Sequence, residues 1–116
     1  MKILIIEDDE SMVELLVKVL SPRYQVTVAR DGKEGVEKFV AERPDLVLMD
    51  IELPKINGVN ATREIKRIDP NAKIIAVTAY AVQRGNEIMS EGAMEVISKP
   101  FRIKHLLEIV EKALVS

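Results

Sequence analysis

Apolar and polar residues along the chain follow two alternating patterns. Short apolar runs of the kind that form β-strands recur five times, and between them apolar residues recur at the three- and four-residue spacing of a helix. Continuous runs indicate strands buried on both faces, whereas Tyr24–Ala29 alternates and is expected at a sheet edge. The five predicted strands are Lys2–Ile6, Tyr24–Ala29, Asp45–Met49, Lys73–Val77 and Met94–Ser98.

Five amphipathic helices are predicted, one after each strand. Pro22 is expected to end the first helix and Pro70 the third, since proline does not continue a helix. Asp31 is expected to cap the second helix with Glu34 as its capping-box partner, and the fourth helix is expected over Ala81–Glu91. The apolar faces consist of Met12, Leu15, Leu16, Val19 and Leu20 in the first helix; Val36, Phe39 and Val40 in the second; Val59, Thr62, Ile65 and Ile68 in the third; Val82, Ile88 and Met89 in the fourth; and Ile103, Leu106, Leu107, Val110 and Leu114 in the fifth.

Strands that alternate with helices predict a parallel sheet with right-handed crossovers. Five such units give an α/β fold of three layers, a doubly wound five-stranded parallel sheet with helices on both faces. A chain of 116 residues is long enough for one domain of this kind. We therefore expect residues 1–116 to form a single domain, with no output domain attached.

Composition and charge narrow the classes of function. Hydrophobic residues make up 47% of the chain and charged residues 31%, which is ordinary for a soluble protein. The net charge of −2 argues against a broad surface for nucleic acid or anionic membrane, because both need clustered lysine and arginine. The absence of cysteine excludes disulfides and thiolate metal sites, and no apolar stretch approaches the roughly twenty residues of a membrane span. We expect a cytoplasmic protein.

Chemically capable side chains follow four of the five predicted strands. Glu7 and Asp8 follow the first strand, Asp50 the third, Thr78 the fourth and Lys99 the fifth. The carboxyl ends of parallel strands share one edge, where open α/β sheets bind ligands. Each residue alone has an ordinary structural explanation, as acids at a helix N-terminus, a turn residue, a cap or a solvated lysine. Their shared position favours the functional interpretation.

The chemistry of this set suits a divalent cation and a phosphoryl group. Three carboxylates close together repel one another, which raises at least one pKa or recruits a cation, and Mg²⁺ prefers oxygen ligands. An Asp50 carboxylate shielded by the metal could attack a phosphoryl donor and form an acyl phosphate. We expect Mg²⁺, the Lys99 ammonium and the Thr78 hydroxyl to neutralise the three equatorial oxygens of the transition state.

The chain resembles the receiver domains of two-component response regulators, and is similar to single-domain chemotaxis and relay regulators. The resemblance covers essentially all 116 residues and rests on four ordered motifs, Ile6-Glu7-Asp8-Asp9, Met49-Asp50-Ile51-Glu52-Leu53-Pro54 with Gly58 following, Val77-Thr78-Ala79, and Ser98-Lys99-Pro100-Phe101. It implies a flavodoxin-like sheet of strand order 2-1-3-4-5. It also implies a stand-alone signalling phosphoacceptor that catalyses only its own phosphorylation and dephosphorylation and relays the signal by phosphorylation-dependent protein binding.

The resemblance assigns roles to the acidic residues. Asp50 would accept a phosphoryl group from the phosphohistidine of a sensor histidine kinase or a histidine phosphotransfer protein. Asp8 would ligate Mg²⁺ directly and Glu7 through water, with Asp50 and the main-chain carbonyl of Glu52 completing the protein ligands. The Glu52 side chain would flank the phosphoryl group, and Asp9 is left to start the first helix.

The resemblance also assigns roles at the last two motifs. Thr78 would sense the phosphoryl group, Lys99 would pair with it, and the Lys99–Pro100 peptide would be cis. Many family members carry an aromatic residue three positions before the lysine, where this chain has Val96. The usual aromatic switch is therefore in question, and Tyr80 is expected to shield the phosphoryl group.

Two surfaces are candidate partner sites under the same resemblance. Met12, Leu15 and Leu16, with Pro100 and Phe101, would receive the four-helix bundle of a kinase or phosphotransfer protein. Burial of the three helix residues in the core is an equally open alternative, because periodicity does not separate core from interface. The family typically binds downstream proteins on the face of the fourth helix, fifth strand and fifth helix, which carries Gln83, Arg84, Glu87, Glu91, Lys104 and Glu108. We expect a monomer that contacts neither nucleic acid nor membrane.

Two alternatives belong to other functional classes. The first is a metal-dependent phosphatase with an aspartyl nucleophile. Such enzymes typically carry a D-x-D motif on the first strand, where this chain has Glu-Asp-Asp-Glu over residues 7–10. The second is a pseudo-receiver that binds partners without phosphate, against which the complete set of acids, threonine and lysine argues.

Overall fold

The computed structural model describes all residues from Met1 to Ser116, and in it five strands alternate with five helices. The strands pair in parallel in the order β2-β1-β3-β4-β5, so the predicted fold class and strand order are confirmed. The half-exposed strand β2 lies at an edge, as its alternating pattern predicted. In chain order the elements are β1 (Lys2–Ile6), α1 (Glu10–Leu20), β2 (Gln25–Ala29), α2 (Gly32–Glu42), β3 (Leu46–Met49), α3 (Gly58–Ile68), β4 (Ile74–Thr78), α4 (Ala81–Ser90), β5 (Glu95–Ser98) and α5 (Ile103–Leu114).

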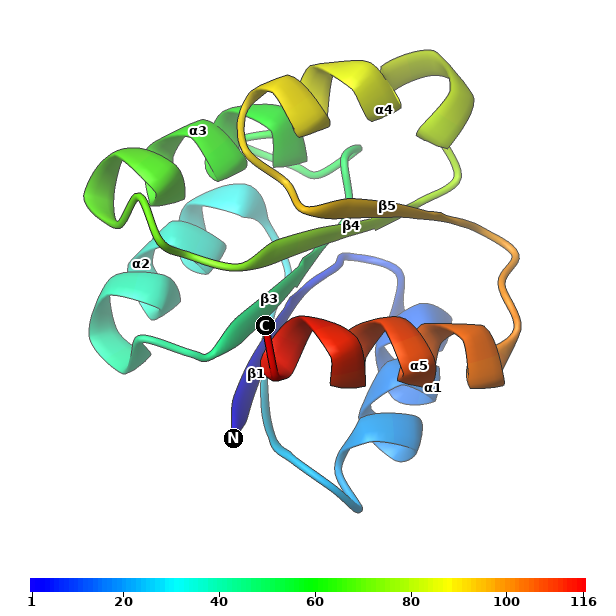
Figure 1. Cartoon of the computed structure of the whole chain (residues 1–116). Helices are drawn as coiled ribbons and strands as arrows, with labels where there is room; N and C mark the ends of the chain where they lie inside the picture. The colour runs from blue at the N-terminus through cyan, green and yellow to red at the C-terminus, as the bar shows by residue number, and fades with distance from the viewer.

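Helices cover both faces of the sheet, α1 and α5 on one face and α2, α3 and α4 on the other (Figure 1). Successive residues of β1 point to opposite faces, as expected for a strand. Ile3 and Ile5 pack in the core under α1 and α5, whereas Leu4 and Ile6 pack in the core under α2, α3 and α4. Every residue of β3 and β4 is buried, which explains why these strands are continuous apolar runs.

Side-chain caps begin the first three helices. The Asp9 carboxylate accepts a hydrogen bond from the Ser11 amide at the start of α1, as expected from its position after Asp8. The Asp31 carboxylate accepts one from the Glu34 amide at 2.8 Å. The Glu34 carboxylate reaches back to the Arg30 amide at 2.7 Å, one residue earlier than the predicted capping box requires.

The predicted buried faces of the helices are partly wrong at their margins. Val40, Ile68 and Ile103 are 48%, 39% and 44% exposed, and all three lie in the terminal turns of their helices, where fewer neighbours cover a side chain. The fourth helix buries Ile88 but exposes Val82 and Met89. In α1 the core positions are Val13, Leu16 and Leu20, whereas Met12, Leu15 and Val19 are half-buried.

Helix α5 is anchored at its C-terminal end. The Lys73 ammonium donates hydrogen bonds to the carbonyl oxygens of Ala113 and Ser116, at 2.8 and 2.9 Å. This end of α5 therefore lies beside the start of β4, and its first turn lies toward the carboxyl ends of the strands (Figure 1). At 12 residues α5 is the longest helix, and none of the helices has the length and apolar character needed to cross a membrane.

Candidate functional site

The residues that follow the strands are held together by hydrogen bonds that extend the sheet. The Glu7 amide donates to the Ala29 carbonyl, and the Asp50 amide donates to the Ile6 carbonyl, each at 3.0 Å. The Lys99 amide donates to the Thr78 carbonyl at 2.9 Å. Together with the parallel pairing of β3 and β4, which sets Met49 opposite Ala76, these bonds bring the carboxyl ends of the strands together, so the side chains that follow them share one edge.

Three carboxylates meet at this edge. One oxygen each from Glu7, Asp8 and Asp50 lies within 4.8 Å of the others. Glu7 and Asp50 are 2% and 8% exposed, whereas Asp8 is exposed. Such a set of oxygen donors, buried on one side and open to water on the other, fits a small divalent cation that keeps some of its waters.

The predicted lysine joins the three carboxylates. The Lys99 ammonium lies 2.5 Å from Glu7 Oε1 and 3.4 Å from Asp50 Oδ2. It reaches them from the end of β5, the last strand of the sheet, and the Lys99–Pro100 peptide is cis, as the resemblance implied. One ammonium thus faces three carboxylates, and the site keeps an excess of negative charge.

This charge and burial change two pKa values. Burial raises the pKa of Glu7 from 4.5 to about 7, and the Asp50 charge adds to the rise, while the hydrogen bond from Lys99 opposes it. Burial alone would lower the pKa of the Lys99 ammonium, but its bond to Glu7 and the Asp50 charge outweigh burial and raise it. The expectation that crowding raises at least one carboxyl pKa is therefore confirmed in direction, with burial as the larger cause.

Thr78 and Glu52 occupy different surroundings from the acid cluster. Thr78 is fully buried at the end of β4, and its hydroxyl accepts a hydrogen bond from the Tyr80 amide at 3.0 Å. The Glu52 side chain is not part of the carboxylate cluster, because it pairs with Arg84 of α4 at 3.0 Å. Tyr80 is 43% exposed. Val96, which occupies the position three before Lys99 where many family members have an aromatic residue, is half-buried against α4.

A close backbone contact fixes the segment after Asp50. The Gly58 amide donates to the Ile51 carbonyl at 2.7 Å, and a Cβ at Gly58 would lie 1.9 Å from the Asp50 carbonyl oxygen. Only glycine leaves room for this approach, which explains the residue in the sequence motif. Gly58 thereby holds the start of α3 directly against the backbone of Asp50.

The two predicted partner surfaces differ from expectation, because one of their residues is buried and several others form ion pairs. Leu16 is 1% exposed and belongs to the core, so it cannot contribute to docking, whereas Met12 and Leu15 are half-buried. On α4, Arg84 pairs with Glu52 and Glu87, and Glu91 pairs with Arg63 of α3. The charged residues of α4 therefore face the β3–α3 side, and a groove of about 350 Å³ lined by Val82, Gly85, Met89, Val96 and others runs between α4 and β5.

Sequence reasoning did not single out the partner of Glu52. The spacing of Arg84 and Glu87 signals a pair within one helix, but nothing in the sequence connects Arg84 with a residue 32 positions earlier. Asp9 also contributes more than a cap, because its amide donates to Glu7 Oε2 at 3.2 Å.

Comparison with known proteins agrees with this fold and site. Residues 3–111 match the family model of the response regulator receiver domain, and the chain belongs to this family. It is 38% identical to the chemotaxis protein CheY of Thermotoga maritima, over 96% of both chains.

Solved structures give the same result. A CheY-like receiver domain protein of Methanospirillum hungatei superposes with a TM-score of 0.93 and 31% identity, covering 98% of this chain and 93% of that one. The response regulator TrrA of Thermotoga maritima, in complex with Mg²⁺ and BeF, superposes with a TM-score of 0.88 and 35% identity, covering 97% of each chain. A phosphoacceptor role in signalling is thus supported by both sequence and structure.

Proposed function

We propose that the protein is a response regulator receiver that accepts a phosphoryl group on Asp50 in a Mg²⁺-dependent reaction. The donor is the phosphohistidine of a sensor histidine kinase or a histidine phosphotransfer protein. The P–N bond of the donor breaks as a bond forms between phosphorus and Asp50 Oδ, which gives an acyl phosphate. The observation that carries this proposal is the cluster of Glu7, Asp8 and Asp50 with the Lys99 ammonium at the carboxyl edge of the sheet.

The carboxylates of Asp8 and Asp50 and the main-chain carbonyl of Glu52 hold the metal directly, and Glu7 holds it through water. The donor set supports this assignment, because three carboxylate oxygens lie within 4.8 Å of one another with only one ammonium to balance them. A bound Mg²⁺ supplies positive charge for a phosphoryl oxygen. The relative TrrA, which was solved with Mg²⁺ and BeF, supports the same choice of metal.

The remaining polar residues orient the phosphoryl group. Lys99, already 3.4 Å from Asp50 Oδ2, neutralises a second phosphoryl oxygen, and the Thr78 hydroxyl exchanges its bond with the Tyr80 amide for one to a third. Because Thr78 is buried at the end of β4, its hydroxyl reaches the phosphoryl group only with a movement of residues 78–80. That movement carries the signal to the start of α4.

A single experiment tests the proposal. The protein is incubated with acetyl phosphate and Mg²⁺, and its intact mass is measured beside that of Asp50→Asn. The expected result is a gain of one phosphoryl group in the wild type only, lost when Mg²⁺ is chelated. Lys99→Met is expected to form the adduct more slowly, because the second oxygen loses its neutralising charge.

Other outcomes contradict the proposal in distinct ways. A gain in mass that persists in Asp50→Asn assigns the phosphoryl group to another residue. Absence of any gain in the wild type favours a pseudo-receiver that binds partners without phosphate. Continuous hydrolysis of a generic phosphate ester favours the aspartyl-nucleophile phosphatase, although the family match argues for a receiver.

The downstream step is binding of a protein target in the phosphorylated state. The groove between α4 and β5, next to the segment that Thr78 moves, supports this location. The domain arrangement around such receivers varies, since the chain matches 96% of CheY but only 26% of a protein-glutamate methylesterase of Desulfitobacterium hafniense.

A further inference from the structure

The segment between β3 and α3 is held at its two ends by different elements. Its second half lies against the N-terminus of α2, where the Gly32 amide donates to the Pro54 carbonyl at 3.3 Å and the Lys55 ammonium lies 3.7 Å from Asp31. Its first half carries Glu52, whose one side-chain hydrogen bond comes from Arg84 of α4. The segment that follows Asp50 is thus fastened from α2 on one side and from α4 on the other.

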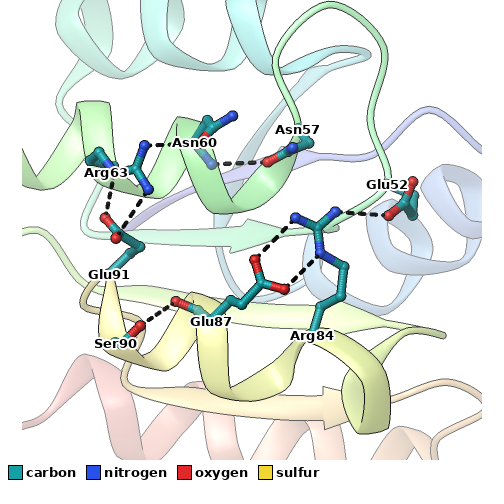
Figure 2. A network of polar contacts seen from close by, with 8 residues as sticks. All are labelled: Glu52, Asn57, Asn60, Arg63, Arg84, Glu87, Ser90 and Glu91. Carbon is teal, nitrogen blue, oxygen red and sulfur yellow. Dashed lines mark hydrogen bonds and ion pairs between the residues drawn. The ribbon is translucent and has the colours of Figure 1, made fainter.

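The Arg84 guanidinium pairs with two carboxylates, those of Glu52 and Glu87 (Figure 2). One nitrogen, Nη1, donates to Glu52 Oε1 at 3.0 Å, while Nε and Nη2 donate to the carboxylate of Glu87, one helical turn further along α4, at 3.3 and 3.2 Å. The Arg84 side chain is 27% exposed, less than either partner. Glu87 fixes the plane of the guanidinium, so that the outer nitrogen is already directed at Glu52.

The other end of α4 is fastened without the phosphoacceptor segment. Glu91 accepts two hydrogen bonds from Arg63 of α3, at 2.8 and 3.2 Å, and Ile88 is fully buried. By contrast, the first turn of α4 has no side-chain cap, and Val82 within that turn is 93% exposed. Arg63 therefore provides a matched cation that ties the same helix to α3 and does not contact Glu52. Its other bond goes to Asn60 of α3, whose amide donates to Asn57 at the far end of the segment (Figure 2).

We propose that Arg84 is a positioning residue for the metal site, which acts by holding Glu52 and with it the backbone that follows Asp50. This inference rests on the proposed function, in which the Glu52 carbonyl is a metal ligand. The side chain and the carbonyl belong to one residue, so a tether on the carboxylate limits where the carbonyl points. Without the tether, Mg²⁺ has to order this backbone itself and binds more weakly.

The sign of the effect separates positioning from simple electrostatics. Arg84 is a cation near a cation site, so removing its charge alone strengthens Mg²⁺ binding. Removing its tether weakens Mg²⁺ binding. We expect the tether to dominate in Arg84→Gln, with a dissociation constant for Mg²⁺ about twofold to fivefold higher, in line with a partly exposed ion pair.

The experiment is calorimetric titration of magnesium chloride at about pH 8 into wild type, Arg84→Gln, Glu52→Gln and the double variant, with Arg63→Gln as the matched control. Arg84→Gln is expected to bind Mg²⁺ more weakly than the wild type, which keeps the pair with Glu52. In the Glu52→Gln background that pair is already lost, so adding Arg84→Gln is expected to strengthen Mg²⁺ binding slightly. Arg63→Gln is expected to bind at least as tightly as the wild type, although it also loosens α4.

A second measurement needs no metal. Amide hydrogen exchange of the metal-free protein reports the segment directly, because three of its amides donate hydrogen bonds within it. The Ile51 amide donates to the Asp50 carboxylate, and the amides of Ile56 and Gly58 donate to backbone carbonyls. Exchange at these three amides is expected to be faster in Arg84→Gln and Glu52→Gln and unchanged in Arg63→Gln.

Three results overturn the inference. The first is that Arg84→Gln binds Mg²⁺ as tightly as the wild type or more tightly. The second is that Arg63→Gln weakens Mg²⁺ binding as much as Arg84→Gln does. The third is that hydrogen exchange at the three amides is the same in Arg84→Gln as in the wild type. If the wild type binds no Mg²⁺, the proposed function fails, and the exchange measurement still decides whether Arg84 holds the segment.

Discussion

Replacing Glu7 with glutamine is expected to change the free energy of unfolding of the metal-free protein by an amount that depends on pH. Glu7 is 2% exposed, and burial with the nearby Asp50 charge raises its pKa from 4.5 to about 7. Between these two pH values the folded state binds a proton on Glu7 that the unfolded state has already released. The wild type therefore loses stability as the pH rises through this window, and levels off above about pH 7.

The magnitude follows from the width of the window. An interval from 4.5 to about 7 corresponds to at most about 3 kcal/mol of stability that ionised Glu7 costs the folded state. Glutamine is uncharged throughout, so Glu7→Gln does not lose this amount. Its stability relative to the wild type is expected to increase by about 1 to 3 kcal/mol between about pH 5 and about pH 9.

Urea denaturation followed by circular dichroism, with a chelator present, measures this difference at each pH. Glu14→Gln, at an exposed position of α1 without an ion pair, serves as the control and is expected to give no such pH dependence. A difference between Glu7→Gln and wild type that stays constant from about pH 5 to about pH 9 refutes the reasoning. Excess Mg²⁺ is expected to shrink the difference above pH 7, because a hundredfold excess over its dissociation constant stabilises the wild type by about 2.7 kcal/mol.

Substitutions at four further positions test the packing of the protein. Thr62→Val is expected to stabilise the protein by about 1 kcal/mol in urea denaturation, because the buried Thr62 hydroxyl has no hydrogen-bond partner, whereas Thr62→Ser keeps the hydroxyl and is expected to destabilise. Gly58→Ala is expected to destabilise the protein and to slow formation of the phosphoryl adduct, since its Cβ would lie 1.9 Å from the Asp50 carbonyl oxygen. The Cβ of Gly85→Ala would meet only Val96, at 3.8 Å, and this variant is expected to gain up to about 1 kcal/mol of stability. Phe39→Ala is expected to lose about 3 to 5 kcal/mol, and a loss below about 1 kcal/mol contradicts its placement in the core.

The sheet was predictable from sequence because each strand has a clear pattern. Runs buried on both faces, such as residues 3–6 of β1, are uniformly apolar, and the sequence of the edge strand Gln25–Ala29 alternates. The helices were less predictable, because an apolar residue at helical spacing lies inside only if the sheet extends beneath it. Ile103 fits the stripe of α5 but lies at its first residue and remains 44% exposed.

The candidate site was predictable for a related reason. Residues that directly follow parallel strands meet at one edge whatever the helices do, so Glu7, Asp50 and Lys99 could be grouped before any coordinates were known. Side chains that reach across from a helix obey no such rule. The pairing of Arg84 with Glu52 depends on where α4 lies over the sheet, and the sequence carries no pattern for that.

In the proposed function, the charge balance of the site would make metal binding and phosphoryl binding depend on each other. Three carboxylates face the Lys99 ammonium, so the metal-free site repels any further anion, including a phosphoryl donor. In the proposed reaction a divalent cation would remove this excess, and a phosphoryl group on Asp50 would bring back only part of it, because the Asp50 carboxylate loses its own charge when the acyl phosphate forms. By reciprocity of binding free energies, a phosphoryl group that binds better with Mg²⁺ present must in turn hold Mg²⁺ more tightly. The same repulsion contributes to the raised pKa of Glu7 in the absence of both, since the Asp50 charge adds to the larger effect of burial.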